Sequence, residues 1–121
     1  MATILVIDDE ASIRTLLRDI LTKEGYQVLE AGDGREGLVM YQQQPVDLVI
    51  MDLLMPNTDG LEATLQLTRE YVDAKVIAIT GAQGDRNFLD VANLFGARRT
   101  FPKPFNIAEL LQAIKEELAA S

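Results

Sequence analysis

Short runs of apolar residues alternate along the chain with longer stretches in which apolar residues recur every three or four positions. Residues 4–7 form a continuous apolar run, Ile-Leu-Val-Ile, which is typical of a strand buried on both faces of a sheet. The stretch that follows predicts an amphipathic helix, which Gly25 ends. The apolar stripe of this helix consists of Ile13, Leu16, Leu17, Ile20 and Leu21.

The same alternation repeats along the rest of the chain. Further strands are predicted at residues 27–31, 46–51, 75–80 and 100–102. Helices are predicted after the capping residues Asp33, Asp59 and Asn106, and another at about residues 86–95. Strands that alternate with helices over short connections indicate one α/β domain, residues 1–121, with a parallel sheet covered by helices on both faces.

The residue types that the chain lacks narrow its chemistry. It has no Cys and no His, which excludes disulfides, thiol or histidine catalysis, and metal sites built on those ligands. Carboxylate, hydroxyl and lysine chemistry remains. Any metal would accordingly be a hard cation held by oxygen ligands.

The charge of the chain bears on its partners. Acidic residues outnumber basic ones by 19 to 11, which gives a net charge of −8. A field of this sign repels phosphate backbones, so we expect no direct binding of nucleic acid. No apolar run approaches the ~18 residues of a membrane span, and the N-terminus lacks the basic start of a signal peptide. We therefore expect a cytoplasmic protein with no membrane attachment.

Polar side chains with reactive groups follow four of the predicted strands. Asp8, Asp9 and Glu10 come after the first strand, Asp52 after the third, Thr80 at the end of the fourth and Lys103 after the fifth. Because ligands of open parallel sheets bind outside the carboxyl ends of the strands, we expect these groups to meet at one edge. Each residue alone has an ordinary explanation, such as a helix cap or a surface lysine, but their shared position favours a site.

The types of group at this edge indicate phosphoryl chemistry. Carboxylates placed side by side repel one another and lose solvation, so their grouping requires compensation. Mg²⁺ can supply it, because this ion takes one or two carboxylates together with waters and substrate oxygens. A metal, a lysine and a hydroxyl all favour an anion with several oxygens, such as a phosphoryl group. A carboxylate that points at the phosphorus can then act as the nucleophile.

The chain resembles the receiver domain of bacterial two-component response regulators, in particular the single-domain chemotaxis type. Five motifs carry the resemblance, in the family's order and at its spacing, and they cover the whole chain. They are Val6-Ile7-Asp8-Asp9-Glu10, Asp52-Leu53-Leu54-Met55-Pro56, Asp59-Gly60, Ile79-Thr80-Gly81 and Lys103-Pro104-Phe105. The resemblance implies a flavodoxin-like fold with five parallel strands in the order 2-1-3-4-5.

The resemblance also implies a role for each matching residue. Asp52 is similar in position to the family's phosphoacceptor, and Thr80 and Lys103 to its contacts with the phosphoryl oxygens. Asp9 matches the direct Mg²⁺ ligand, and Asp8 assists through water. The complete set of metal ligands implied is Asp8, Asp9, Asp52 and the backbone carbonyl of Leu54. The Lys103-Pro104 bond matches the family's cis peptide.

The function implied is a phosphorylation-dependent signalling switch, not an enzyme with a separate substrate. The phosphoryl donor would be a histidine kinase, a phosphotransfer protein or a small acyl phosphate. The response would be a change in the surface formed by helix 4, strand 5 and helix 5, read by a downstream protein or a fused output domain. The protein would be a monomer or a weak dimer.

Two departures from the family pattern affect that surface. Thr100 stands where most members carry an aromatic ring, so we expect the readout to depend more on the loop after the fourth strand. Arg98 and Arg99 replace an acidic pair common in dimerising members. With Arg86 they predict a basic patch that suits an acidic partner.

Three other interpretations share parts of this pattern. A flavodoxin-like electron carrier needs a phosphate-binding loop after the first strand, where Asp8, Asp9 and Glu10 stand. An aspartyl-phosphate phosphatase of the dehalogenase type carries its nucleophile after the first strand, together with a cap. An inert interaction module with the same fold has no need to keep Asp52 or Lys103.

Overall fold

The computed structural model describes residues 1–53, 60–81, 90 and 92–120. Their strands and helices are β1 (Thr3–Ile7), α1 (Ala11–Lys23), β2 (Gln27–Ala31), α2 (Gly34–Gln43), β3 (Leu48–Asp52), α3 (Gly60–Glu70), β4 (Val76–Thr80), β5 (Arg99–Pro102) and α5 (Ile107–Ala119). Residues 92–94 are also helical, inside the helix predicted at 86–95. Among the described residues, no helix is long and apolar enough to cross a membrane.

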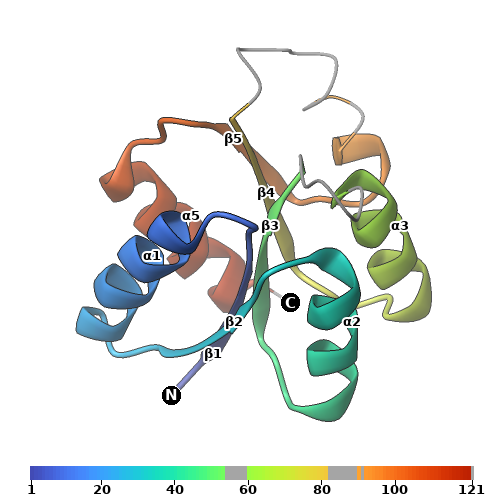
Figure 1. The fold of residues 1–121 in the computed structure, drawn as a ribbon, viewed down its shortest axis with the longest axis horizontal. Coiled ribbons are helices and arrows are strands. Elements are labelled where there is room, and N and C mark those ends of the chain that lie inside the picture. The colour runs from blue at the N-terminus through green and yellow to red at the C-terminus, as the bar shows by residue number, and fades with distance from the viewer. Residues whose placement is uncertain (54–59, 82–89, 91, 121) are drawn as a thin grey trace.

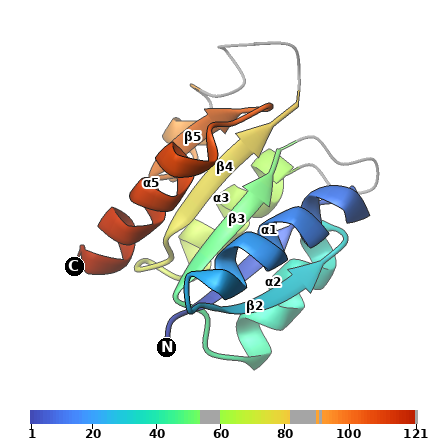
Figure 2. The same ribbon diagram turned by 90° about the vertical axis from the view of Figure 1, so that its left-hand side faces the viewer.

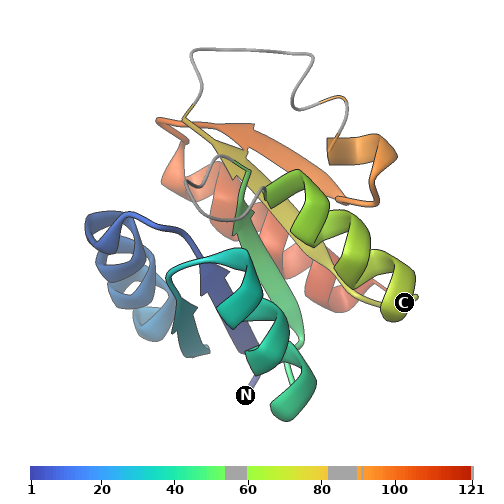
Figure 3. The ribbon, with the colours of Figure 1, turned by 45° about the vertical axis from the view of Figure 1, so that its right-hand side comes forward.

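The sheet has the architecture that the sequence pattern predicted and the strand order that the resemblance implied. Its five parallel strands lie in the order β2-β1-β3-β4-β5. Helices α1 and α5 cover one face, and α2 and α3 cover the other (Figure 1). Figure 2 looks onto the α1 and α5 face, whereas Figure 3 brings α2 and α3 forward. The molecule is therefore a three-layer α/β sandwich.

Both faces of the sheet are buried, which explains the continuous apolar runs. Successive strand residues point to opposite faces, so Ile4 and Val6 pack in the core under α1 and α5. Leu5 and Ile7 pack in the second core, under α2 and α3. Every one of these side chains is at most 1% exposed. A strand with two buried faces has no position that favours a polar residue until its end.

The ends of the helices follow the predicted signals. The Asp33 side chain caps α2 by accepting from the Glu36 amide at 2.8 Å, and Asn106 caps α5 by accepting from the Glu109 amide at 3.0 Å. Gly25 follows α1 with φ of +92°, a left-handed conformation that glycine adopts without steric cost. The predicted cap Asp59 lies outside the described residues.

The third strand begins two residues later than predicted. Asp47 precedes β3 and is tied to the start of β1 instead, because its carboxylate accepts from the Thr3 amide at 2.7 Å. Its own amide donates to the Thr3 carbonyl at 2.8 Å. At its other end the strand includes Asp52, which pairs in register with Ile79 of β4. The ladder therefore holds the Asp52 backbone in place.

Candidate functional site

The carboxyl ends of the strands bring acidic residues from two neighbouring strands together. Asp8 follows β1 directly, and Asp52 is the last residue of β3, the strand beside it. Both residues are buried, with 0% and 1% of their surface exposed. Burial of two carboxylates this close is unfavourable without a nearby cation. The predicted edge of the sheet is therefore a site of concentrated negative charge.

Hydrogen bonds from three parts of the chain fix Asp8. Its amide donates to the Ala31 carbonyl of β2 at 3.1 Å, and its Oδ1 accepts from the Glu10 amide at 2.8 Å. The Arg14 guanidinium of α1 donates to the Asp8 carbonyl oxygen at 2.5 Å, and its Nε lies 3.6 Å from Glu30 of β2. The turn that carries the first acidic motif is thus held on both sides.

Lys103 reaches into the same pocket from the segment after β5. Its ammonium lies 3.0 Å from Asp8 Oδ2, 3.2 Å from Glu10 Oε1 and 3.6 Å from Asp52 Oδ2. Its backbone amide donates to the Thr80 carbonyl at 2.6 Å, which joins the ends of β4 and β5. The Lys103-Pro104 peptide is cis, as the resemblance implied. One cation is therefore shared among three carboxylates.

These contacts set the protonation of the lysine. Burial acts to lower the pKa of Lys103, but the hydrogen bond to Asp8 and the negative charges of Asp52 and Asp8 outweigh it. The net result is a raised pKa. Lys103 therefore carries its positive charge at physiological pH and can serve as a hydrogen-bond donor to an anion.

The structure brings most of the predicted site residues together. Asp8, Asp52 and Lys103 are in direct contact range, and Thr80, fully buried, is the last residue of β4 and bonds to Lys103 through its backbone. Asp9 is exposed beside Asp8. Leu54, predicted as a metal ligand through its carbonyl, lies outside the described residues. The prediction of roles for these residues rests on the resemblance.

Gly60 allows α3 to pack closely against the end of β3, which carries Asp52. It is the first residue of α3 and donates its amide to the Leu53 carbonyl at 3.1 Å. A Cβ on this glycine would overlap the carbonyl oxygen of Asp52 and crowd the backbone of Leu53. Only a residue without a side chain lets α3 approach the end of β3 this closely. Close packing therefore explains why the Asp59-Gly60 motif has a glycine at its second position.

The donor groups fit a hard divalent cation. Carboxylate oxygens of Asp8, Asp9 and Glu10 lie within 4.8 Å of one another, next to buried Asp52. The single positive charge of Lys103 does not balance the three carboxylates around it. Mg²⁺ prefers carboxylate oxygens and keeps several waters, so this half-open acidic pocket suits it.

Two contacts at the site were not predicted. Glu10 was recognised as part of the acidic motif, but its hydrogen bond with Lys103 was not. The two residues are 93 positions apart, so the local sequence pattern does not indicate their contact. Arg14 was not among the predicted site residues. A basic residue one turn after the acidic motif is a signal for its contact with Asp8, although a weak one.

The predicted basic patch is not present in the form expected. Arg98 and Arg99 are both paired within the chain, with Glu117 accepting from each at 3.4 and 3.0 Å. Arg99 also donates to Glu116 at 2.8 Å. Helix α5 lies beside β5 and brings its glutamates to these arginines, which neutralises their charge. The third member of the predicted patch, Arg86, lies outside the described residues.

The chain matches a family model and curated proteins over most of its length. Residues 4–115 match the family model of the response regulator receiver domain. The chain is 35% identical over 115 residues to sporulation initiation phosphotransferase F of Bacillus subtilis, covering 95% of this chain and 92% of that protein. It is 39% identical over 119 residues to the transcriptional regulatory protein PdtaR of Mycobacterium tuberculosis, covering 98% of this chain but 56% of that protein.

A solved structure with the same fold contains bound ligands. The response regulator protein TrrA of Thermotoga maritima, in complex with Mg²⁺ and BeF, superimposes with a TM-score of 0.88 at 37% identity. The match covers 97% of this chain and 99% of that one. Electron carriers and dehalogenase-type phosphatases share parts of the architecture, but the family match distinguishes this chain from them. The chain belongs to the receiver domains of two-component response regulators.

Proposed function

We propose that the protein is a signalling switch that accepts a phosphoryl group on Asp52 in the presence of Mg²⁺. The observation that supports this most directly is the position of Asp52 at the end of β3, almost fully buried, with the Lys103 ammonium 3.6 Å away. The adjacent ammonium attracts the buried carboxylate and restricts its orientation. The carboxylate is therefore prepared to act as a nucleophile.

In the proposed reaction, a carboxylate oxygen of Asp52 attacks the phosphorus of the donor. A new O–P bond forms as the bond from phosphorus to the donor breaks, and that bond's electron pair stays on the donor. The donor is a phosphohistidine, whose imidazole nitrogen is released, or an acyl phosphate, whose carboxylate is released. Lys103 donates to an equatorial phosphoryl oxygen, and the Thr80 hydroxyl is proposed to donate to another. Hydrolysis of the Asp52 phosphate later returns the switch to its resting state.

In this proposal Mg²⁺ would be held by Asp9 directly, by Asp52 and the Leu54 carbonyl, and by Asp8 through water. When bound, it neutralises charge on the phosphoryl oxygens. The acidic cluster and the Mg²⁺ of the TrrA complex support this assignment. The protein has no separate substrate in this proposal, because the acceptor is its own side chain.

An apolar groove beside the site is the proposed docking place of the donor protein. It has a volume of about 310 Å³ and runs between α1 and the start of α5. Its lining consists of Ile13, Leu16, Lys103, Pro104, Phe105 and Ile107. Leu16 and Ile107 are 42% and 41% exposed, although the sequence pattern placed Leu16 on the buried stripe of its helix. Since Lys103 belongs to both groove and pocket, a histidine kinase or phosphotransfer protein docked here would face Asp52.

The output is proposed to begin at Thr80. A phosphoryl group on Asp52 places acceptor oxygens near the end of β4, and drawing the Thr80 hydroxyl inward would move the residues that follow it. Hydrogen exchange with and without a beryllium fluoride mimic tests this route. We expect changed protection in residues 81–95, whereas changes confined to the Asp52 pocket would exclude it.

Mass analysis after exposure to an acyl phosphate tests the central proposal. We expect the wild-type chain to gain one phosphoryl group with Mg²⁺ and none when the metal is chelated. Asp52→Asn should gain none in either condition, because its amide is a poor nucleophile. Phosphorylation of Asp52→Asn at the wild-type rate would show that another residue is the acceptor.

The docking proposal needs a separate experiment with a cognate donor protein. Ile13→Ala should slow transfer from that donor but leave phosphorylation by the small acyl phosphate unchanged. Val39→Ala is the matched control, because Val39 is 44% exposed on α2, on the opposite face of the sheet. Equal transfer rates in the wild type and in Ile13→Ala would remove the groove from the docking surface.

A further inference from the structure

Glu10 lies at the N-cap of α1, but its side chain does not cap the helix. It is the N-cap of α1, where Ser, Thr, Asp and Asn are favoured because their side chains accept from the first free amides of the helix. The Glu10 side chain makes no such bond. Its carboxylate instead contacts Lys103, 93 residues further along the chain, at 3.2 Å. The local structure therefore does not account for this carboxylate.

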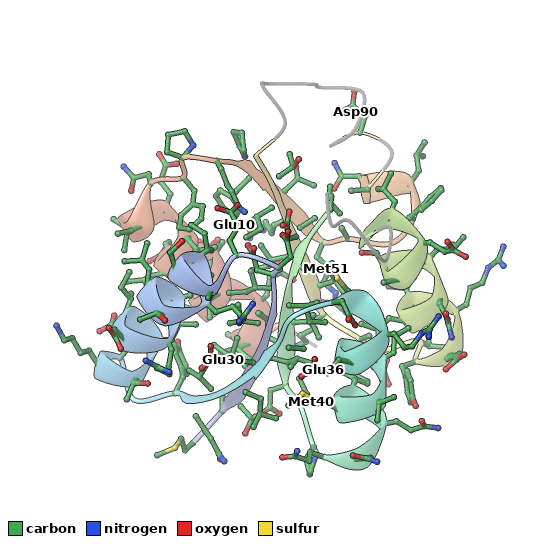
Figure 4. The ribbon with its side chains drawn as sticks, in the orientation of Figure 1. Glu10, Glu30, Glu36, Met40, Met51 and Asp90 are labelled. Atoms are coloured by element: carbon green, nitrogen blue, oxygen red, sulfur yellow. The ribbon has the colours of Figure 1, made fainter. Side chains whose placement is uncertain are left out.

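The geometry around Lys103 indicates that the Glu10 carboxylate orients the lysine ammonium. The ammonium has three hydrogens and faces Asp8 at 3.0 Å, Glu10 at 3.2 Å and Asp52 at 3.6 Å. The side chains of Asp8 and Asp52 are 0% and 2% exposed, but that of Glu10 is 55% exposed. Figure 4 shows Glu10 at the N-terminal end of α1, near the ends of the strands. Glu10 thus holds the ammonium from the rim of the pocket.

We propose that Glu10 is a positioning residue that holds the Lys103 ammonium from the exposed side of the pocket in the resting protein and competes with phosphoryl oxygens for it. This inference rests on the proposed function, since it concerns the same lysine and the same anion. An arriving phosphoryl group must replace Glu10 as a partner of Lys103. The exposed carboxylate therefore weakens the binding of a phosphoryl group at Asp52 and favours the unphosphorylated state.

Fluoroberyllate binding at saturating Mg²⁺ measures this competition without chemistry. Glu10→Gln keeps the shape of the side chain and removes its charge, so the ammonium is free to turn to the anion. We expect the variant to bind fluoroberyllate about two- to fivefold more tightly than the wild type, the range typical of a partly exposed ion pair. Repeating the titration at twice the Mg²⁺ concentration confirms saturation, because Glu10 also adds negative charge near the metal ligands.

Glu24→Gln is the matched control. Glu24 is an exposed residue that follows α1 at its other end, so the substitution changes the net charge by the same amount far from the pocket. We expect its fluoroberyllate affinity to equal that of the wild type. Equal tightening in both variants would mean that net charge alone sets the affinity, which would overturn the positioning role.

A double-mutant cycle tests whether the effect passes through Lys103. In a Lys103→Met background the Glu10→Gln substitution should no longer change fluoroberyllate affinity. If the tightening persists there, Glu10 acts by repelling the anion directly, and the proposed hold on Lys103 is wrong. Lys103→Gln is a second background, because its amide can still donate to Asp8 should the methionine variant fail to fold.

The outcomes separate this inference from the proposed function. If the wild type binds fluoroberyllate and Glu10→Gln binds it equally well, the proposed function stands and the role of Glu10 is rejected. If the wild type does not bind it at all in saturating Mg²⁺, the proposed function fails and the inference falls with it. The rate of phosphorylation by an acyl phosphate gives a second readout, which should rise in Glu10→Gln by a similar factor.

Discussion

Two clusters of charged residues lie on the sheet and differ in how their charges balance. The site cluster consists of Lys103 with Asp8, Glu10 and Asp52, one cation facing three carboxylates. The α5 cluster consists of Arg98 and Arg99 with Glu116 and Glu117, two cations facing two carboxylates. Both join segments far apart in the sequence. Only the α5 cluster is electrically neutral.

In the α5 cluster each charged side chain has a partner of opposite charge within the cluster. Glu117 is 9% exposed and accepts from both arginines, so its buried charge has the partners that such a charge requires. Lys75 strengthens the same region by donating to the Glu117 and Ala120 carbonyls, both at 2.6 Å, at the C-terminal end of α5. This cluster fastens α5 to the sheet and needs no ligand.

In the site cluster the negative charges outnumber the positive ones. Asp8 and Asp52 are as buried as any core residue, yet their combined charge exceeds what Lys103 supplies. Such an excess of buried negative charge is unfavourable without a further cation, which agrees with the proposed binding of Mg²⁺. The comparison teaches that unbalanced charge, rather than charge as such, distinguishes the pocket at which we propose ligand binding from the rest of the charged surface.

Removal of the proposed metal ligand Asp9 should have the largest effect on this comparison. We expect Asp9→Ala to lower Mg²⁺ affinity at least about tenfold, because Mg²⁺ takes few protein oxygens and loses one of them. Isothermal titration calorimetry on the unphosphorylated protein measures the change. Glu116→Gln in the α5 cluster serves as the control and should leave the affinity as it is. An unchanged affinity in Asp9→Ala would contradict its role as the direct ligand.

Neutralising one carboxylate in each cluster should change stability in opposite directions. In the absence of metal, Asp52→Asn relieves repulsion in the site cluster, so we expect the free energy of unfolding to rise by about 0.5–1 kcal/mol. Glu117→Gln leaves two arginines short of a partner, and we expect a fall of about 1 kcal/mol. Denaturant unfolding monitored by circular dichroism measures both. The comparison fails if both variants shift in the same direction.

Mg²⁺ should also affect the stability of the Asp52→Asn and Glu117→Gln variants differently. It should stabilise the wild type and Glu117→Gln alike, and stabilise Asp52→Asn less, because a ligand stabilises the folded state only as far as it binds.

Alkaline pH should weaken the site cluster through Lys103. Its pKa is raised in the folded protein, so the stability gained from its charge is complete below the ordinary lysine value of 10.5 and is lost as pH rises through the higher folded value. We expect the stability difference between the wild type and Lys103→Met to shrink above that pH. Unfolding measured from about pH 8 to about pH 12 tests this, since tyrosine ionisation affects both proteins equally. A difference that stays constant would mean that the lysine charge contributes nothing.

Acid should weaken the α5 cluster through Glu116, and this is the smallest of the expected effects. The hydrogen bond from Gln112, followed by that from Arg99, lowers the pKa of Glu116 below its ordinary value of 4.5. The associated stability is present above that value and is lost as pH falls through the lower folded value. Glu116 lies at the surface, where solvent and salt screen the pair, so the effect should be small. Glu116→Gln should be slightly less stable than the wild type at neutral pH and equally stable in strong acid.

The sequence by itself determined the elements of the fold and the edge at which the site lies. The apolar run at residues 4–7 required a strand with two buried faces, and Asp33 and Asn106 specified where two helices begin. These are local signals, because burial period and capping depend on neighbours within one turn or one strand. In a parallel sheet, the end of each strand then falls at a common edge. This is why Asp8 and Asp52 could be assigned to one pocket before any contact was known.

Tertiary structure alone decided how the charges pair. Arg98 and Arg99 look like a free basic patch in the sequence, and they are neutralised because α5 packs beside β5 and brings Glu117 to them. Glu10 stands in the sequence as the third acidic residue of its motif, and it contacts Lys103 because the segment after β5 brings that lysine to the ends of β1 and β3. Local pattern carries no information on contacts between residues so far apart, since these depend on which helix covers which strand. The strength of an ion pair depends on that geometry and on burial, which only the folded chain defines.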